Sequence, residues 1–590
     1  MSRADTESTT ALWWSLLAAL AAGGLADAYL AWGSVSATAF SLPALLLPLT
    51  TAAMLVGIIA ATLAALRPLT RATAAIAGAI ALLAIALSLL DLTPPVARDE
   101  LTHHLAIPAL YLRAQRIVEV PFAEQSYYPM LIEMAYTPLL QWLPDNLPKC
   151  LHLLYGLASA ALVMLHVRRT RDAALAALAG LLVLSTPAVF VLSSSAYIDL
   201  GLLFYSTAAL VALLRWSDDF DTRWLAAGAL LAGCAGATKY NGLLVIVLLS
   251  AVTVLLPRAE IGGAQRLRSA MLFAGLALLP VLPWLLKNAA QTGNPMFPLF
   301  NTLLGGRPLP LRRGIDLLTQ RRALYGESWL DVALIPARIF LTGRDGDPAR
   351  FDGVLSPLLL LGIGAAVSRN ASRHTRVLAL YAGVYALLAF FLISLRVRYS
   401  IVIVAPLVLL AIDQLAHLLR AGGAAPMLAR LAVGGTLLFS AAHFVQLWQR
   451  VDPLPYLTGH LGRDGYIAQF VPEYAALQFA NRTLPPTARL YLLFLGNRSY
   501  YCERDYFYDT YFSGVALRQH IEASTDADDL AARLRRAGLS HLLSADALLT
   551  GYLRDALSDE QRSRWDDFAQ RGLRRLYSRG GFGLYEIREN

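Results

Sequence analysis

The side chains of this sequence that could act as acids, bases or metal ligands are concentrated just after its third long apolar block, in the string RDELTHH at residues 98–104. If this segment forms an α-helix, Asp99 and His103 share one face at a spacing of four, and Glu100 and His104 share the adjacent face. Two carboxylates and two imidazoles at a bilayer surface could supply a general base, a divalent-metal site, or both. The alternative is an ordinary helix start, in which the acids complement the helix dipole and the histidines are solvated.

Three more ionisable residues stand near the ends of apolar blocks. Glu133 follows the string SYYPMLIE and could face the same cavity as Asp99, or be an ordinary interfacial residue. Asp199, in AYIDLG, and Lys239, in TKYNG, are expected at the outer ends of their helices. Charged groups at membrane depth are costly and usually point into a polar cavity, although a lysine can also snorkel to the interface.

A pair of arginines, Arg396 and Arg398, precedes Tyr399 between two late apolar blocks. Guanidinium groups bind phosphate in a bidentate manner, so a lipid phosphate would explain two of them on the outer side. A plain interfacial role is the alternative. The segment 288–352 carries further arginines, which could line a path for an anionic headgroup or form a solvated face; among them are Arg312, Arg313, Arg321 and Arg322.

The elements that must position these residues are membrane-spanning helices. The chain has 590 residues, 57% hydrophobic and only 15% charged, against roughly 25% charged in soluble domains. Its apolar blocks have the length of about 20 residues needed to cross a bilayer. We expect about thirteen spans, at 11–33, 40–66, 72–93, 147–167, 173–192, 197–215, 223–238, 242–256, 269–287, 353–368, 375–395, 399–419 and 430–447.

Arginine placement predicts the orientation. Most arginines of the short connections fall on one side, for example at 168–171 and 258–268, and by the positive-inside rule this side is cytoplasmic. The N-terminus is then cytoplasmic, while the long segments 94–146 and 288–352 and the C-terminus are extracytoplasmic. We expect an integral protein of the inner or plasma membrane.

The net charge of +9 does not indicate nucleic-acid binding. Residues 448–590 carry equal numbers of basic and acidic side chains, so the excess lies among the spans, where it reports orientation or contact with membrane lipids. The three cysteines are far apart and form no zinc-binding spacing.

Two domains are predicted. Residues 1–447 form the transmembrane domain. Residues 448–590 alternate strand-like runs, at 489–495, 540–544 and 583–588, with helical stretches, which is typical of a small α/β layer. No glycine-rich phosphate loop follows these strands, so a recognition or docking role is expected for this domain.

Together the motifs resemble those of polytopic glycosyltransferases of the GT-C class, close to family-39-like and protein-mannosyltransferase-like enzymes. The matching strings run in family order over roughly residues 90–410: RDELTHHLAIPALYL, SYYPMLIEMAY, AYIDLG, TKYNGLL, TGNPMFPLFN and RVRYSIVIVAP. Two features depart from the family: two additional spans precede the acidic motif, and His103 stands where relatives carry a tyrosine or another polar residue. The WWDYG-type signature of oligosaccharyltransferases is absent, which argues against that branch.

The resemblance implies a donor made of a sugar on a polyprenyl phosphate and a glycan, lipid or protein acceptor. It implies that Asp99, with Glu100, carries catalysis by deprotonating the acceptor during an inverting displacement. Arg398, with Lys239 and Tyr399, would hold the donor phosphate, and His103, His104, Glu133 and Asp199 would support the site. A divalent metal on Asp99, His103 and Glu133 is an open alternative, because metal dependence varies among relatives.

Other classes of function remain open from the residues alone. A lipid-linked glycan flippase or transporter would also place charges near spans, but such proteins often show internal repeats, and none is found here. A polymerase or ligase of cell-surface polysaccharide would use related chemistry. A non-catalytic scaffold that displays the C-terminal domain would leave the acidic motif unexplained.

Overall fold

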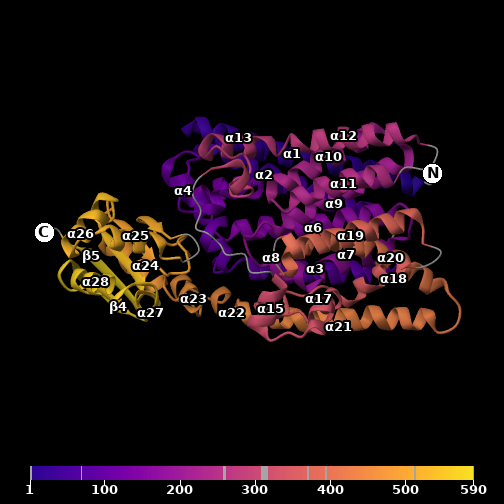
Figure 1. The fold of residues 1–590 in the computed structure, drawn as a ribbon. Coiled ribbons are helices and arrows are strands. Elements are labelled where there is room, and N and C mark those ends of the chain that lie inside the picture. The colour runs from indigo at the N-terminus through magenta and orange to yellow at the C-terminus, as the bar shows by residue number, and fades with distance from the viewer. Residues whose placement is uncertain are drawn as a thin grey trace.

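The computed structural model describes residues 3–67, 69–256, 261–306, 317–367, 371–392, 395–509 and 513–588. Arg312, Arg313 and part of the basic connection 258–268 lie outside these ranges. Up to residue 451 the described part of the chain is mainly helical, and a compact sheet-containing domain follows at one end of the helical bundle (Figure 1).

The bundle is built from long apolar helices and a few shorter ones. They are α1 (Arg3–Val35), α2 (Leu46–Ala65), α3 (Arg71–Asp91), α6 (Leu147–Arg168), α7 (Ala173–Leu184), α8 (Pro187–Ser193), α9 (Asp199–Asp219), α10 (Thr222–Thr238), α11 (Gly242–Leu255), α12 (Gly263–Leu278), α13 (Leu282–Thr292), α18 (Leu360–Val367), α19 (Arg373–Leu392), α20 (Val404–Arg420) and α21 (Ala425–Val451). Among the described residues, seven helices are long and apolar enough to cross a membrane, or up to nine if each of two bent pairs counts as one span. The bends are 63° between α7 and α8 and 56° between α12 and α13. The count of thirteen crossings stays a prediction.

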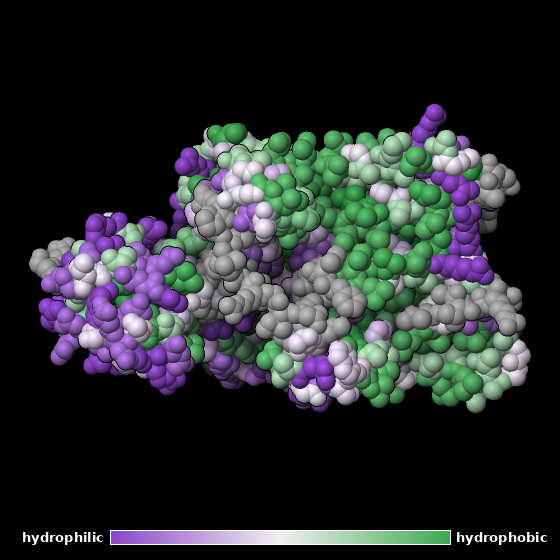
Figure 2. All heavy atoms as spheres, in the orientation of Figure 1, coloured by the Kyte–Doolittle hydropathy of each residue, from purple (hydrophilic) through white to green (hydrophobic). Residues whose placement is uncertain are grey.

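The helices differ sharply in how much of their surface the protein covers. In the apolar 18-residue stretch of α9, 94% is buried inside the protein, whereas only 17% of the corresponding stretches of α3 and α21 is buried. Glycine allows α10 and α12 to pack closely. If Gly233 of α10 carried a Cβ atom, that atom would lie 2.4 Å from the carbonyl oxygen of Ala277 in α12, which is too short for a van der Waals contact. Figure 2 shows an apolar surface over α10, α11 and α12, between the hydrophilic C-terminal domain and hydrophilic residues at the opposite end of the bundle. This arrangement is that of a helical bundle whose sides face lipid.

Both predicted outer segments contain short helices. The first holds the π-helical turn η3 (Glu100–His104), α4 (Ala106–Ala114), η4 (Glu124–Tyr127) and α5 (Leu131–Trp142). The second holds α14 (Asn301–Leu304), α15 (Leu317–Tyr325), α16 (Trp329–Ala333), α17 (Ile335–Leu341) and η5 (Pro348–Arg350), and η6 (Pro357–Leu359) leads into α18. Another short turn, η7 (Val397–Ile403), precedes α20.

The C-terminal domain is a five-stranded mixed sheet covered by helices, with strand order β2-β1-β3-β5-β4. Its elements are α22 (Leu454–Leu457), α23 (Arg463–Phe470), α24 (Tyr474–Thr483), β1 (Arg489–Leu493), β2 (Asp505–Tyr508), α25 (Val515–Ala523), α26 (Ala527–Arg536), β3 (His541–Ala545), α27 (Asp546–Ala556), α28 (Asp559–Arg571), β4 (Leu573–Arg579) and β5 (Phe582–Ile587). Strand β1 is parallel to β2 and β3, with Leu490 opposite Tyr506 and His541. The predicted fold class, a polytopic helical membrane protein with a small α/β domain, is confirmed.

The C-terminal domain is fastened to the first outer segment by direct contacts. The backbone N–H of Tyr500 donates to the carbonyl of Leu101 over 3.1 Å, and the Tyr501 hydroxyl donates to the carbonyl of Pro95 over 2.7 Å. Leu101 also joins a small apolar cluster with Ile467 and Val471. The domain is therefore fixed beside the turn that carries the acidic motif.

Candidate active site

Asp99 and Arg398 are distant in the sequence and meet at the end of the bundle next to the C-terminal domain. Arg398 Nη1 lies 2.6 Å from Asp99 Oδ2, and the two side chains keep exposed fractions of 14% and 21%. Burial alone would raise the pKa of Asp99, but the adjacent Arg398 guanidinium holds that pKa well below its usual range. Asp99 is therefore an ionised carboxylate whose basicity is suppressed by its partner.

A second ion pair lies beside the first, across an aromatic ring. Lys239, just after α10, places its Nζ 2.9 Å from Oδ1 of Asp199, the first residue of α9. The ring centre of Tyr399 lies 4.6 Å from Lys239 Nζ and 5.2 Å from Arg398 Cζ. Each cation is thus neutralised by its own carboxylate, and an anion that enters here competes with Asp99 and Asp199.

Glu100 has a different environment from its neighbour Asp99. Its side chain is buried, and its two oxygens accept hydrogen bonds from the backbone N–H groups of Ala196 over 2.5 Å and Ala97 over 2.8 Å. Burial raises the pKa of Glu100. These bonds tie the start of the first outer segment to the turn between α8 and α9, so the geometry favours a positioning role over proton transfer.

The acidic motif does not form the regular α-helix that its spacing predicted. In η3 the N–H of Leu105 donates to the carbonyl of Glu100 over 2.9 Å, a five-residue turn, and the α-helix begins only at Ala106. Such wide turns are rare and frequently occur at functional sites. His104 Nδ1 lies 2.8 Å from Glu133 Oε1, whereas His103 Nδ1 lies 2.8 Å from the hydroxyl of Thr102. The turn therefore directs the two histidines to different partners.

Burial sets the protonation of this histidine group. It lowers the pKa of His103 to about 4 and that of His104 well below its usual range, and it raises the pKa of Glu133 to about 8. Both imidazoles are therefore neutral at pH 7, and Glu133 holds a proton that it can donate to His104. The pair forms an uncharged hydrogen bond beneath Asp99.

His152 is a positioning residue that the sequence analysis missed. The N–H of Leu200 donates to His152 Nε2 over 2.9 Å, so Nδ1 carries the proton and donates to the carbonyl of Ser195 over 2.8 Å. The imidazole thereby joins the turn after α8 to the first turn of α9. Asp199, which binds Lys239, starts this same turn.

A cavity of about 470 Å³ opens at Asp99 and Arg398. Its apolar wall includes Val191 and Leu192 of α8, and its polar wall includes Glu100 and Tyr197. Five further charged residues line it that the sequence did not assign to the site: Arg98, Lys149, Asp345, Asp352 and Arg450. Lys239 and Tyr399 are not among its lining residues, whereas Arg396 and Arg398 both line it.

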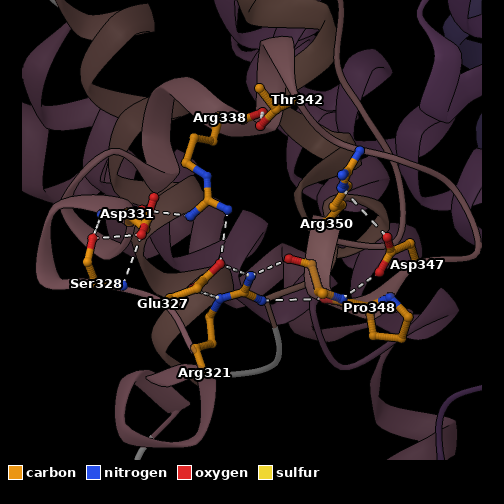
Figure 3. A network of polar contacts seen from close by, with 10 residues as sticks. Arg321, Glu327, Ser328, Asp331, Arg338, Thr342, Asp347, Pro348 and Arg350 are labelled. Atoms are coloured by element: carbon orange, nitrogen blue, oxygen red, sulfur yellow. Dashed lines mark hydrogen bonds and ion pairs between the residues drawn. The ribbon is translucent and has the colours of Figure 1, made fainter. Parts of the chain in front are cut away.

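The second outer segment supplies one wall of the cavity and is held in shape by a buried arginine (Figure 3). Arg321 binds Glu327 through two contacts of 2.6 Å and donates to the carbonyls of Pro348 and Ala349, while Arg338 binds Glu327 over 3.0 Å. Arg321 therefore has a structural role, unlike the path for an anionic headgroup considered from the sequence.

That wall is linked directly to the arginine pair. The N–H of Val397 donates to the carbonyl of Phe351 over 2.8 Å, and Arg396 Nη1 lies 3.4 Å from Asp352 Oδ2. Phe351 and Asp352 have φ angles of 66° and 43°, which bend the chain sharply. Through these contacts, the turn at Phe351 and Asp352 fixes the backbone just before Arg398 and so helps to place its side chain near Asp99.

The ligand set suggested for a metal is not gathered in one place. Within the described ranges, no group of three or more histidine, cysteine, aspartate or glutamate side chains is arranged to hold a metal ion. His103 bonds to Thr102 and Glu133 bonds to His104, so these two residues and Asp99 do not form a common ligand set.

Comparison with known proteins gives one family match. Residues 144–296 match the family model described as dolichyl-phosphate-mannose-protein mannosyltransferase. This segment runs from α6 to α13 and contains Asp199 and Lys239. No curated protein sequence matches the chain significantly.

Solved structures give matches over most of the chain. Two structures of ArnT from Cupriavidus metallidurans, one apo and one bound to undecaprenyl phosphate, align with a TM-score of 0.50 at 17% identity, over 86% of this chain and 96% of theirs. The archaeal oligosaccharyltransferase AglB from Archaeoglobus fulgidus, in complex with an inhibitory peptide and a dolichol-phosphate, aligns at 13% identity with a TM-score of 0.45, over 86% and 74% of the chains. The similarity to ArnT shows a shared fold.

Proposed function

We propose that this chain, a polytopic membrane protein of the GT-C class, is an inverting glycosyltransferase that moves a sugar from a polyprenyl-phosphate donor to an acceptor outside the membrane. The observation that carries the proposal is the contact of 2.6 Å between Asp99 and Arg398 at the mouth of a cavity. A base and a phosphate-binding cation at one point are what such a transfer requires. The mannosyltransferase family match over residues 144–296 supports the same reaction class.

The reaction needs few groups because its leaving group is stable. The acceptor oxygen attacks the anomeric carbon, and its proton passes to the carboxylate of Asp99. The bond from the anomeric carbon to the phosphate oxygen breaks, and its electron pair stays on that oxygen. Arg398 stabilises the resulting phosphate anion, so no general acid is needed.

Donor binding prepares the base in this scheme. The donor phosphate competes with Asp99 for Arg398, and a guanidinium that binds phosphate bidentately no longer neutralises the carboxylate. The pKa of Asp99 then rises from its depressed value, and the carboxylate becomes a stronger base. Asp99 is thus activated only when a donor is present, which limits unproductive chemistry in the empty site.

We place the lipid tail of the donor along the surface between α8 and α21. A smaller cavity of about 30 Å³, lined by Pro187 and Val191 of α8 and by His443 and Leu447 of α21, shares lining residues with the larger one. The surface of α21 is mostly uncovered by protein, as expected for a helix that faces lipid. An undecaprenyl phosphate is bound by the structurally similar ArnT, and a carrier of this kind is the donor lipid we propose here.

The test is to incubate purified protein with a panel of polyprenyl-phosphate sugars, together with an extract of membrane lipids and glycans as the source of acceptor, and to measure the polyprenyl phosphate released. We expect release from at least one donor by the parent protein and its loss in Asp99→Asn. The control is Asp221→Asn, which removes a carboxylate paired with Arg223 beyond the far end of α9. Movement of donors across liposomes without cleavage would instead identify a flippase and refute the proposal.

A further inference from the structure

We propose that a second cavity, on the other side of Asp99, is the acceptor subsite and that it binds a sugar of a glycan chain. This inference rests on the proposed function and extends it to the acceptor class. The cavity has a volume of about 230 Å³ and lies between the first outer segment and the C-terminal domain. Its walls include His103, Phe122, Gln125, Asn497 and Tyr508.

The two cavities meet at the proposed base. Asp99 lines both, as do Arg98 and Arg396, whereas Arg398 lines only the larger cavity. Inversion requires the acceptor oxygen to approach the anomeric carbon from the side opposite to the leaving phosphate. With the phosphate held at Arg398, the smaller cavity is the compartment from which an acceptor can reach Asp99 on that side.

The chemistry of the walls favours a carbohydrate. The rings of Phe122 and Tyr508 are 4.9 Å apart at 81°. Phe122 is partly exposed and offers an apolar surface against which the C–H face of a sugar can pack, and the buried Tyr508 holds that ring in place. The amides of Gln125 and Asn497 offer both donors and acceptors, which suits hydroxyl groups. The volume lies below the roughly 300–1,000 Å³ of sites for drug-sized ligands, so the cavity suits a single sugar unit.

The C-terminal domain holds its part of the cavity rigidly. The segment after β1 turns sharply, with φ angles of 63° at Phe494, 73° at Gly496 and 57° at Asn497. A left-handed φ is unfavourable for Phe494, and such strain persists at functional sites where the surroundings hold it. Next to this turn, the Arg498 guanidinium binds the buried Glu473 through contacts of 2.5 and 2.6 Å, which anchors the segment.

The position in the sheet is also one that binds ligands in other folds. Asn497 follows β1, and Tyr508 is the last residue of β2, so both lie at the carboxyl ends of parallel strands. Open α/β sheets bind ligands at this edge. The C-terminal domain, expected from the sequence to serve recognition, would therefore complete the acceptor subsite.

A third cavity indicates room for more than one sugar. It has a volume of about 560 Å³ and shares Phe122 and Tyr508 with the acceptor subsite. Its other walls include the polar side chains Glu119, Arg489 and Gln519. A glycan whose terminal sugar occupies the subsite can extend past the aromatic pair into this cavity.

The first experiment measures binding without relying on activity. Full-length protein in nanodiscs is mixed with trisaccharides of glucose, mannose and galactose, and saturation transfer to the sugar protons is recorded by NMR. We expect transfer to at least one trisaccharide, and its loss in Tyr508→Ala and in the double variant Gln125→Ala/Asn497→Ala. The matched control is Tyr577→Ala, in strand β4 at the other edge of the sheet, which should bind as the parent does.

The second experiment measures transfer, using the donor found by the release assay and the trisaccharide that binds. We expect Tyr508→Ala to raise the KM for the trisaccharide roughly tenfold, as loss of an aromatic contact would, with the KM for the donor changed by less than about twofold. If Tyr508→Ala is poorly folded, the double variant gives the same test with two partly exposed amides.

The outcomes separate the two proposals. The acceptor subsite is refuted if no trisaccharide shows saturation transfer, if the variants bind and react as the parent does, or if a serine- and threonine-containing peptide is the acceptor instead. Trisaccharide binding that depends on Tyr508, in a protein that releases no polyprenyl phosphate, would support the subsite and refute the proposed transferase.

Discussion

Replacing Asp99 by asparagine should tighten the binding of polyprenyl phosphate while it abolishes sugar transfer. In the resting protein Arg398 is engaged by Asp99 at 2.6 Å, so the lipid phosphate has to displace a carboxylate before it can bind. Asparagine keeps the shape of the side chain and can still accept a hydrogen bond from the guanidinium, but it removes the competing charge. A residue that only helped to bind the donor would have the opposite effect.

The size of the effect follows from the nature of the contact. The hydrogen bond from the cationic guanidinium survives in the variant, so the substitution removes the charge–charge part of the contact, which is about 1 kcal/mol for a pair in water and about 4 kcal/mol near a protein surface. The amide therefore holds Arg398 less strongly by at least about 1 kcal/mol, which corresponds to about fivefold or tighter binding of the phosphate. Removal of the repulsion between Asp99 and the phosphate acts in the same direction.

The assay is a titration of detergent-solubilised protein with a short-chain polyprenyl phosphate, followed by isothermal calorimetry. Arg398→Gln should bind the lipid more weakly than the parent, and Asp221→Asn should bind it equally well. If Asp99→Asn binds the phosphate with the same or lower affinity than the parent, Asp99 and the donor phosphate do not compete for Arg398 and the reasoning is wrong.

Three further predictions concern stability. Lys239→Met should lower the melting temperature, because it leaves the buried Asp199 without its cation at a cost of about 3–5 kcal/mol; a melt like that of the parent would contradict this role. Burial raises the pKa of Glu133 to about 8 in the folded protein, whereas the unfolded chain releases this proton near pH 4.5. Between these two values, the free energy of unfolding therefore falls by about 1.36 kcal/mol per pH unit as the pH rises. Glu133→Gln lacks this loss, so the melting temperature of the parent should fall relative to the variant between about pH 5 and 8, and parallel curves would refute the assignment. Arg321→Met should destabilise the second outer segment, because it leaves Glu327 with Arg338 as its single cation, and it should raise the KM for the donor. Limited proteolysis measures the first effect and donor titration measures the second. If neither changes, Arg321 does not support this segment.

The sequence was most informative about the ionisable residues that stand next to long apolar blocks. Asp99, Asp199, Lys239 and Arg398 stand out because ionisable groups are rare beside spans, and the structure gathers all four into two adjacent ion pairs. Their pairing could be anticipated only from a shared position at the outer ends of helices. The roles assigned to them stay predictions until the variants are measured.

The local geometry of the acidic motif could not be read from its spacing. The i, i+4 pattern predicts an α-helix, but Glu100 accepts hydrogen bonds from the backbone N–H groups of Ala97 and the distant Ala196, and the chain forms a wider turn here. The spacing paired Glu100 with His104, whereas the structure pairs His104 with Glu133. Such pairings depend on contacts between distant segments.

The C-terminal domain was predicted in outline. Strands β1, β3 and β5 coincide with apolar runs, but β2 and β4 were missed because both lie at sheet edges. Strand β4 has two arginines exposed in succession, which hides any alternating pattern. The sharp turn at Gly496 and Asn497, which shapes the proposed acceptor subsite, has no comparable signal in the apolar pattern.

The most direct test of the account is the anomeric configuration of the transferred sugar, read by NMR from the coupling of its anomeric proton. Direct displacement with Asp99 as base predicts a product of the configuration opposite to that of the donor, formed by the parent and not by Asp99→Asn. A product that keeps the donor configuration, or equal rates for the two proteins, would contradict the account.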